Sequence, residues 1–81
     1  MLDKTIRLNI LFDFYGKLLS GRCQEVFLLY YEENLSLSEI SMELNVSRQA
    51  VHDALHRAMD SLEGYEEKLR LAAAELEKNS V

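Results

Sequence analysis

The chain of 81 residues contains no proline, no tryptophan, three glycines and one cysteine. Proline and glycine are the residues that most often interrupt helices, so their scarcity favours an all-helical chain. A single cysteine cannot form an intramolecular disulfide, and the sequence does not cluster the ligands that a metal site needs, so we expect neither a metal nor a cofactor. The sequence also has no glycine-rich phosphate loop and no nucleophile elbow. We therefore expect no enzymatic activity and no small-molecule substrate.

Long apolar runs are absent as well. No segment reaches the length of a membrane span, and the opening residues Met1-Leu-Asp-Lys lack the pattern of a secretion signal. We therefore expect a cytoplasmic protein with no membrane contact. Hydrophobic residues make up 48% of the chain, which favours a folded domain over a disordered one. Residues 1–81 amount to one domain with a modest core, so oligomerisation is a reasonable way to bury more apolar surface.

The most informative local pattern lies in residues 36–58. Ser36 and Glu39 have the spacing of a capping box at the start of a first helix. Asn45 tolerates the left-handed backbone conformation that ends a helix, and Val46 is expected to insert into the core. Two short helices joined by such a turn form a helix-turn-helix motif, which is typical of nucleic-acid readers.

The second helix of this motif has a polar outer side. Ser47 can cap it, and the apolar residues Val51, Leu55 and Ala58 recur at helical spacing on its inner side. A motif of this kind presents the start and the outer side of its second helix to the major groove. We expect these candidate nucleic-acid-binding residues there: Ser47, Arg48, Gln49, His52, His56 and Arg57.

Each of these side chains has a plausible contact. Arg48 can pair with a guanine or a phosphate, Gln49 can read adenine, and the Ser47 hydroxyl can reach a phosphate. Arg57 suits a phosphate or a neighbouring acid. His52 and His56 lie one turn apart but have no third ligand, which favours groove or surface contact over metal binding. The alternative is that this polar face is only solvated.

The charge balance counts against a strong nucleic-acid binder. The net charge is −5, and residues 36–58 hold two basic and three acidic groups. Phosphate affinity comes from lysine and arginine, so contact with DNA would involve few phosphates and would favour a dimer or a neighbouring partner.

Two further helices precede the motif. We expect the first over about residues 4–19, with Ile6, Ile10 and Phe14 on an apolar stripe that Leu11 and Leu18 widen. Ser20 is expected to cap the second, over about residues 21–32. This second helix is apolar nearly all round and should be deeply buried. The predicted fold is thus a compact all-α, four-helix helix-turn-helix domain.

A heptad seam runs from the motif towards the C-terminus. Its members are separated alternately by four and three residues: Val51, Leu55, Ala58, Leu62, Tyr65, Leu69, Ala72 and Leu76. This period is typical of helices that coil around one another. It predicts one long C-terminal helix over about residues 48–78, whose distal half forms a homodimer interface through Leu62, Tyr65, Leu69, Ala72 and Leu76. The alternatives are that the seam is ordinary core, or that a kink near Gly64 lets the tail fold back.

The chain resembles the YlxM-like family of small bacterial helix-turn-helix proteins associated with the signal recognition particle. The matching segments are Leu11-Phe-Asp-Phe-Tyr15, Leu29-Tyr-Tyr31, Leu37-Ser-Glu-Ile40, Val46-Ser-Arg-Gln-Ala-Val51 and Leu62-Glu-Gly-Tyr-Glu-Glu-Lys-Leu69. More distantly, the motif is similar to the promoter-reading C-terminal region of sigma factors. One departure is Ser20-Gly21-Arg22, where relatives often have a Thr-Pro-like cap.

The resemblance implies a DNA-binding regulatory protein whose partners include DNA, or RNA, and components of the signal recognition particle. The alternative is a protein-interaction module that docks on the particle's GTPase and modulates it without reading DNA. Relatives can carry a longer basic tail, and we expect weaker nucleic-acid affinity from a chain that lacks one. The resemblance implies no enzyme activity and no cofactor.

Overall fold

The computed structural model describes residues 3–79, and within that range every regular element is a helix. The elements are α1 (Lys4–Tyr15), the 3-10 turn η1 (Gly16–Leu18), α2 (Gly21–Tyr31), α3 (Leu37–Leu44), α4 (Arg48–Leu69) and α5 (Leu71–Asn79). The all-α helix-turn-helix fold is confirmed.

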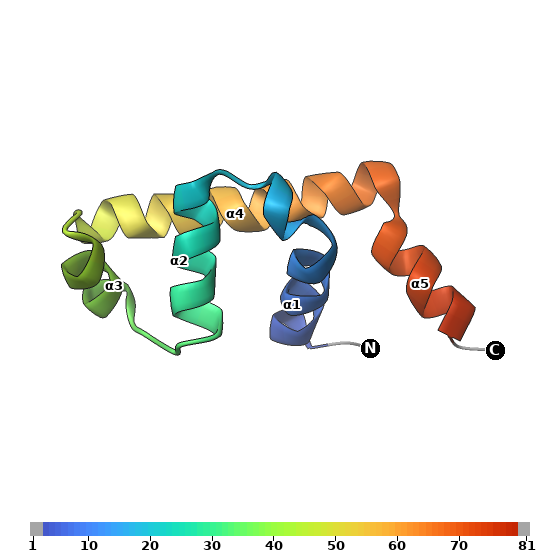
Figure 1. Cartoon of the computed structure of the whole chain (residues 1–81), viewed down its shortest axis with the longest axis horizontal. Coiled ribbons are helices and arrows are strands. Elements are labelled where there is room, and N and C mark those ends of the chain that lie inside the picture. Colours follow the sequence, from blue (N-terminus) through green and yellow to red (C-terminus); the bar gives the residue numbers. More distant parts are fainter. Residues whose placement is uncertain (1–2, 80–81) are drawn as a thin grey trace.

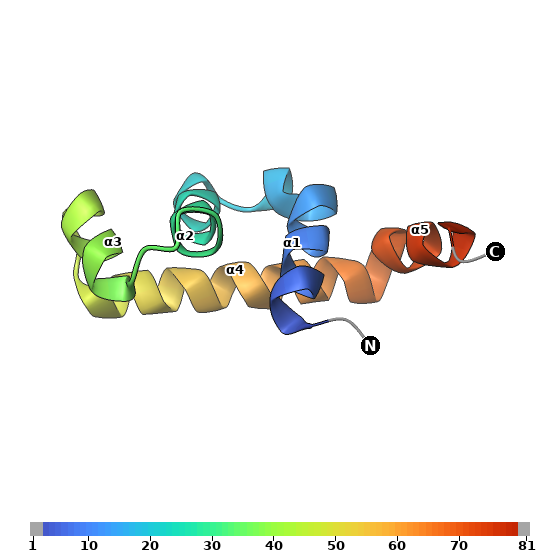
Figure 2. The same cartoon turned by 90° about the horizontal axis from the view of Figure 1, so that it is seen from below.

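The longest helix, α4, organises the molecule. Helices α1, α2 and α3 each pack against α4, and they follow one another along it in reverse chain order (Figures 1 and 2). The molecule is therefore elongated, with extents of 46 × 21 × 16 Å. The inner side of α4 forms the floor of the core through Val51, Ala54, Leu55, Ala58 and Leu62. The predicted inward set Val51, Leu55 and Ala58 is thus confirmed.

The apolar stripe predicted for the first helix is wrong at both of its ends, although Ile10 packs against the core. Ile6 is 51% exposed and Phe14 is 40% exposed. The buried side chains of α1 are instead Leu8, Leu11 and Tyr15. Both triplets have helical spacing, and α1 packs against α4 and α5 through the second. The helix also ends at Tyr15, four residues earlier than expected, and continues as η1.

The interior is filled by aromatic stacking between α1 and α2. The ring of Phe27 is fully buried and lies parallel to that of Phe12, with centroids 4.5 Å apart. The Phe12 ring also packs over Gly16, where an added Cβ would come within 2.9 Å of it. Gly16 therefore allows the close approach of Phe12 to the turn after α1. As predicted, Ser20 caps α2, accepting a hydrogen bond from the Cys23 amide at 3.2 Å.

The prediction of one unbroken helix over residues 48–78 is wrong. Helix α4 ends at Leu69, Arg70 has a left-handed conformation with φ 53°, and α5 then begins at Leu71. Figure 1 shows that α5 turns away from the axis of α4. The tail bends away from the axis of α4 and does not fold back along it, and Gly64 stays helical, since the bend lies six residues after it.

A buried carboxylate explains the break. Glu66 is only 6% exposed and accepts hydrogen bonds from the Tyr15 hydroxyl at 2.6 Å, the Ala72 amide at 3.1 Å and the Ala73 amide at 3.0 Å. The Tyr15 hydroxyl in turn accepts from the Leu71 amide at 3.0 Å. These contacts satisfy amides in the first turn of α5 that have no partner within their own helix. From the sequence alone, Glu66 and Glu67 are expected to lie on a solvated helix face, and for Glu66 this expectation is wrong.

The pKa values of this pair follow from the same contacts. Burial acts to raise the pKa of Glu66, but the hydrogen bonds from Tyr15 and from the two backbone amides outweigh it, so the pKa lies below its ordinary value. Burial, together with the hydrogen bond to Glu66, raises the pKa of Tyr15. Glu66 is therefore ionised and Tyr15 protonated at neutral pH, as their hydrogen bond requires.

Candidate nucleic-acid interface

The helix-turn-helix motif consists of α3, a three-residue turn and the first half of α4. At the start of α3, the Glu39 amide donates to the Ser36 hydroxyl at 3.1 Å, and the Ser36 amide donates to the Glu39 carboxylate at 2.9 Å. The predicted capping box is confirmed, and its two reciprocal bonds fix where α3 begins.

The turn has the conformation expected from its sequence. Asn45 is left-handed with φ 54°, and the Val46 amide donates to the Ser41 carbonyl at 3.0 Å. Val46 packs against the core. Left-handed backbone at the end of a helix reverses the chain direction within a few residues. This corner directs α4 away from α3 and leaves the outer side of its first turns open.

The start of α4 is positive. The Ser47 hydroxyl caps it by accepting a hydrogen bond from the Ala50 amide at 3.0 Å, so the predicted cap is confirmed. The first turn of α4 contains no acidic residue, and Arg48 is its first member. A cation at a helix N-terminus is unfavourable for the helix dipole, so Arg48 adds nothing to helix stability through charge. Its exposed guanidinium and the helix N-terminus instead form a local positive centre that attracts anions.

The predicted reading residues share the exposed side of α4. Gln49, His52 and His56 follow at spacings of three and four residues, and all three are exposed. The two imidazole rings lie 4.3 Å apart between centroids. Arg57 is also exposed and flanks this group. The six predicted residues are therefore accessible together, and their contact with a nucleic acid remains a prediction.

Asp53 lies in the middle of this face, although it is not among the predicted reading residues. Its carboxylate accepts a hydrogen bond from the Gln49 amide at 2.9 Å and lies 3.5 Å from the His52 ring nitrogen Nδ1. The hydrogen bond from Gln49, followed by that of His52 and the charge of Arg57, lowers the pKa of Asp53. A negative charge therefore persists between the two arginines, and Gln49 must leave Asp53 before it can read a base.

After Arg57 the exposed side of α4 is mainly acidic, with Lys68 in its last turn as the exception. Asp60, Glu63 and Glu67 follow on exposed positions. Glu63 is bound by Arg7 of α1 through two hydrogen bonds of 3.0 and 2.6 Å, which also raise the pKa of Arg7. The candidate interface is thus limited to the first three turns of α4, and the distal part of the outer side is acidic.

The predicted dimer seam is partly used by the chain itself. Leu62 is fully buried and Ala72 is 3% exposed, so neither is available to a second chain in this conformation, and the prediction for these two is corrected. Tyr65 is half-buried, and its ring lies 5.9 Å from that of Tyr15. Leu69 is 52% exposed and Leu76 45% exposed. Leu62 and Ala72 thus belong to the core of a single chain, in which α1 packs against both α4 and α5, and pairing through the other three residues stays a prediction.

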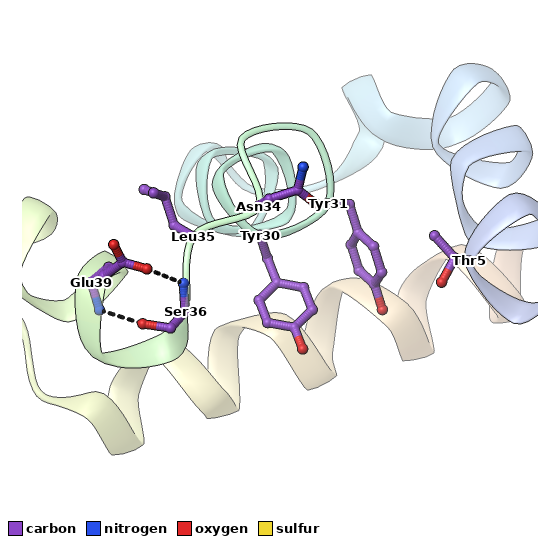
Figure 3. A pocket seen from close by; sticks show the side chains of 7 residues that line it. All are labelled: Thr5, Tyr30, Tyr31, Asn34, Leu35, Ser36 and Glu39. Carbon is purple, nitrogen blue, oxygen red and sulfur yellow. Dashed lines mark hydrogen bonds between the residues drawn. The ribbon is translucent and has the colours of Figure 1, made fainter.

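A hollow of about 430 Å³ is lined in part by the loop that joins α2 to α3. Figure 3 shows its lining, which consists of Thr5, Tyr30, Tyr31, Asn34, Leu35, Ser36 and Glu39. The rings of Tyr30 and Tyr31 meet edge to face, with centroids 5.0 Å apart, and both side chains are half-buried against the core. The lining contains a carboxylate and no lysine or arginine, so it does not suit a phosphate.

Within residues 3–79, no group of three or more histidine, cysteine, aspartate or glutamate side chains could hold a metal ion. None of the helices in this part of the chain is both long enough and apolar enough to cross a membrane. The lone Cys23 is buried, and its thiol lies 3.5 Å from the carbonyl oxygen of Ala54.

Comparison with known proteins identifies relatives along most of the chain. Residues 2–81 match the family UPF0122, described as "Putative helix-turn-helix protein, YlxM / p13 like". A UPF0122 protein of Halalkalibacterium halodurans is 52% identical over 80 residues, which are 99% of this chain and 72% of that protein. A second, from Shouchella clausii, is 54% identical over 71 residues, or 88% of this chain and 65% of that protein. A third, from Caldanaerobacter subterraneus, is also 54% identical over 71 residues, here 61% of its length. The matched region thus spans about two thirds of the length of these relatives.

Proposed function

Because the chain belongs to the UPF0122 family of YlxM / p13-like helix-turn-helix proteins, we propose that it binds double-stranded DNA through residues 47–57 and acts as a regulator. The observation that supports this proposal most strongly is the geometry of the corner at Asn45 and Val46. It leaves the polar side of the first three turns of α4 exposed, while the opposite side of the same turns is buried. A helix with this division fits the major groove, which is wide enough for one α-helix.

Each residue then has a distinct role. Arg48, at the positive N-terminus of α4, pairs with a guanine or with a phosphate, and Ser47 and Arg57 contact the backbone. His52 and His56 lie along the groove and contribute positive charge only when protonated. Asp53 carries a negative charge between the two arginines and opposes phosphate contact. Two arginines and one carboxylate make a weak site, which favours binding as a homodimer with two half-sites.

The test is a titration of a duplex DNA library by fluorescence anisotropy at several salt concentrations. We expect affinity to fall as salt rises, and we expect Arg48→Ala to lower the affinity and reduce the slope of log K against log salt by about 1. Lys78→Ala removes the same charge at the end of α5 and serves as the matched control. We expect it to leave the slope of log K against log salt unchanged and to alter the affinity only through the net charge of the protein. No binding at low salt, or equal losses in the two variants, would contradict the proposal.

A second candidate function has its own support. The net charge of −5 and the acidic distal side of α4, with Asp60 and Glu67, favour docking on a basic protein surface. We choose the GTPase of the signal recognition particle as the partner for a retention experiment, because the family resemblance implies it. If the protein is retained on the immobilised GTPase and ignores DNA at low salt, and Glu67→Lys abolishes that retention, the second function holds in place of the first.

A further inference from the structure

The bend between α4 and α5 occurs where the sequence favours a helix. The segment from Arg70 to Leu76 contains three alanines, two leucines, an arginine and a glutamate, which are all good helix formers. Arg70 nevertheless adopts φ 53°, a conformation that is unfavourable for any residue with a Cβ atom. No glycine or proline forces the break. The left-handed turn is therefore imposed by the docking of α5 and not by local preference.

The docking of α5 buries little apolar surface. Ala72 is the one side chain of residues 71–78 that is buried, whereas Leu71 and Leu76 are 48% and 45% exposed. A hollow of about 90 Å³ remains where α5 meets α1, lined by Ile10, Leu11 and residues of α5. Apolar packing thus contributes little, and the position of α5 depends mainly on the hydrogen bonds that Glu66 and Tyr15 form with the amides of residues 71–73.

A continuous helix would satisfy the same amides. In an unbroken helix the amides of residues 71, 72 and 73 bond to the carbonyls of residues 67, 68 and 69, so no backbone donor is left without a partner. The 4-3 spacing of the seam also continues across the bend without a shift. Straightening the chain at Arg70 therefore aligns Leu69, Ala72 and Leu76 on one face with Tyr65.

We propose that α5 is a releasable arm. On release it joins α4 in one helix, and the seam formed by Tyr65, Leu69, Ala72 and Leu76 pairs with the same seam of a second copy of this chain. The inference builds on the homodimer proposed above and does not depend on DNA binding.

A second copy suits this seam for two reasons. Leu69 and Leu76 are already exposed in the docked form, so release of α5 has to uncover only Ala72 and the covered part of Tyr65. In an antiparallel pair of arms, Lys68 at one flank of the seam lies beside Glu75 at the same flank of the other copy, so the charges next to the apolar face are complementary. The seam has only four positions, and pairing is accordingly weak and depends on protein concentration.

The arm is tested by measuring the distance between α1 and α5. Spin labels at Lys4→Cys and Lys78→Cys, in a Cys23→Ala background diluted with unlabelled protein, report this distance within one chain. Glu66→Gln and Tyr15→Phe weaken the docking contacts from two different helices. Arg70→Gly is the matched control, because glycine accepts the left-handed turn and disfavours a continuous helix.

If α5 is released in these variants, two linked changes should be measured. We expect both weakened variants to lengthen the mean label distance by about 10 Å or more, since a nine-residue helix is roughly 13 Å long. We expect their sedimentation mass to rise from 9.4 kDa towards twice that value as concentration increases. Arg70→Gly should keep the short distance and the monomer mass. Adding Leu69→Asp to Glu66→Gln should restore the monomer while the distance stays long.

Three results would overturn the proposal. A short distance in both Glu66→Gln and Tyr15→Phe, in protein shown to be folded by circular dichroism, excludes a releasable arm. A long distance with a monomer mass at all concentrations excludes the second copy as its partner. A dimer with a short distance excludes the arm but preserves the homodimer proposed above. Loss or retention of DNA binding by Arg48→Ala bears on none of these outcomes.

Discussion

Asn45 allows a test in which the sign of a mutational effect reveals the backbone conformation. In a helix interior, glycine is less stable than alanine by about 1 kcal/mol. In the left-handed conformation the order reverses, because alanine pays a steric cost of about 1–2 kcal/mol that glycine avoids. Asn45 has φ 54° and ψ 46°, so its position is left-handed. We therefore expect Asn45→Gly to be more stable to unfolding than Asn45→Ala by about 1 kcal/mol or more.

The matched control is Gly64, which is helical and whose Cβ would meet nothing within 4 Å. Gly64→Ala should stabilise the protein by about 1 kcal/mol. Urea and thermal unfolding followed by circular dichroism measure both effects, and 1 kcal/mol corresponds to a Tm shift of roughly 4–8 °C for a domain of this size. If Asn45→Ala is as stable as Asn45→Gly or more so, α3 runs on past Leu44 and the corner that exposes the reading face does not exist.

Three further predictions concern other parts of the molecule. Gly16→Ala should lower the unfolding free energy by about 1–3 kcal/mol, because its Cβ would press on the Phe12 ring; unchanged stability in urea would mean that the ring moves freely. Asp53→Asn should strengthen binding to duplex DNA in the anisotropy assay, because it removes the negative charge between Arg48 and Arg57; weaker binding would indicate that Asp53 contacts a base. The lowered pKa of Glu66 stabilises the fold fully above the unfolded value of about 4.3, and this contribution is lost as pH falls through the folded value. The free energies of unfolding of the parent and of Glu66→Gln, measured as a function of pH, should therefore converge in acid and differ at neutral pH.

The parts of the structure that follow from neighbouring residues could be predicted from the sequence. The capping box of Ser36 and Glu39, the left-handed Asn45 and the cap at Ser47 depend on side chains within three or four positions of the backbone they bind. The exposure of the reading residues follows from the same local rules, since the apolar side of the motif helix is unambiguous there.

The parts that depend on distant residues could not be predicted. The partner of Glu66 on α1 is Tyr15, 51 positions away, and the spacing of charges around Glu66 indicates a solvated helix face. The heptad seam runs straight through Arg70, so the sequence pattern favours a continuous helix where the folded chain bends. In α1 two apolar triplets both have helical spacing, and only packing against α4 and α5 determines that Leu8 is buried and Ile6 is not.

The central claim is that the exposed side of α4 after the Asn45 corner is the surface that meets DNA. Mapping amide chemical-shift changes by NMR during titration with duplex DNA tests it most directly, since it identifies the contact surface without any mutation. The account predicts that the largest changes fall on residues 47–57, with smaller ones at the start of α3. Changes centred on α1 and α5, or no changes at low salt, would contradict it.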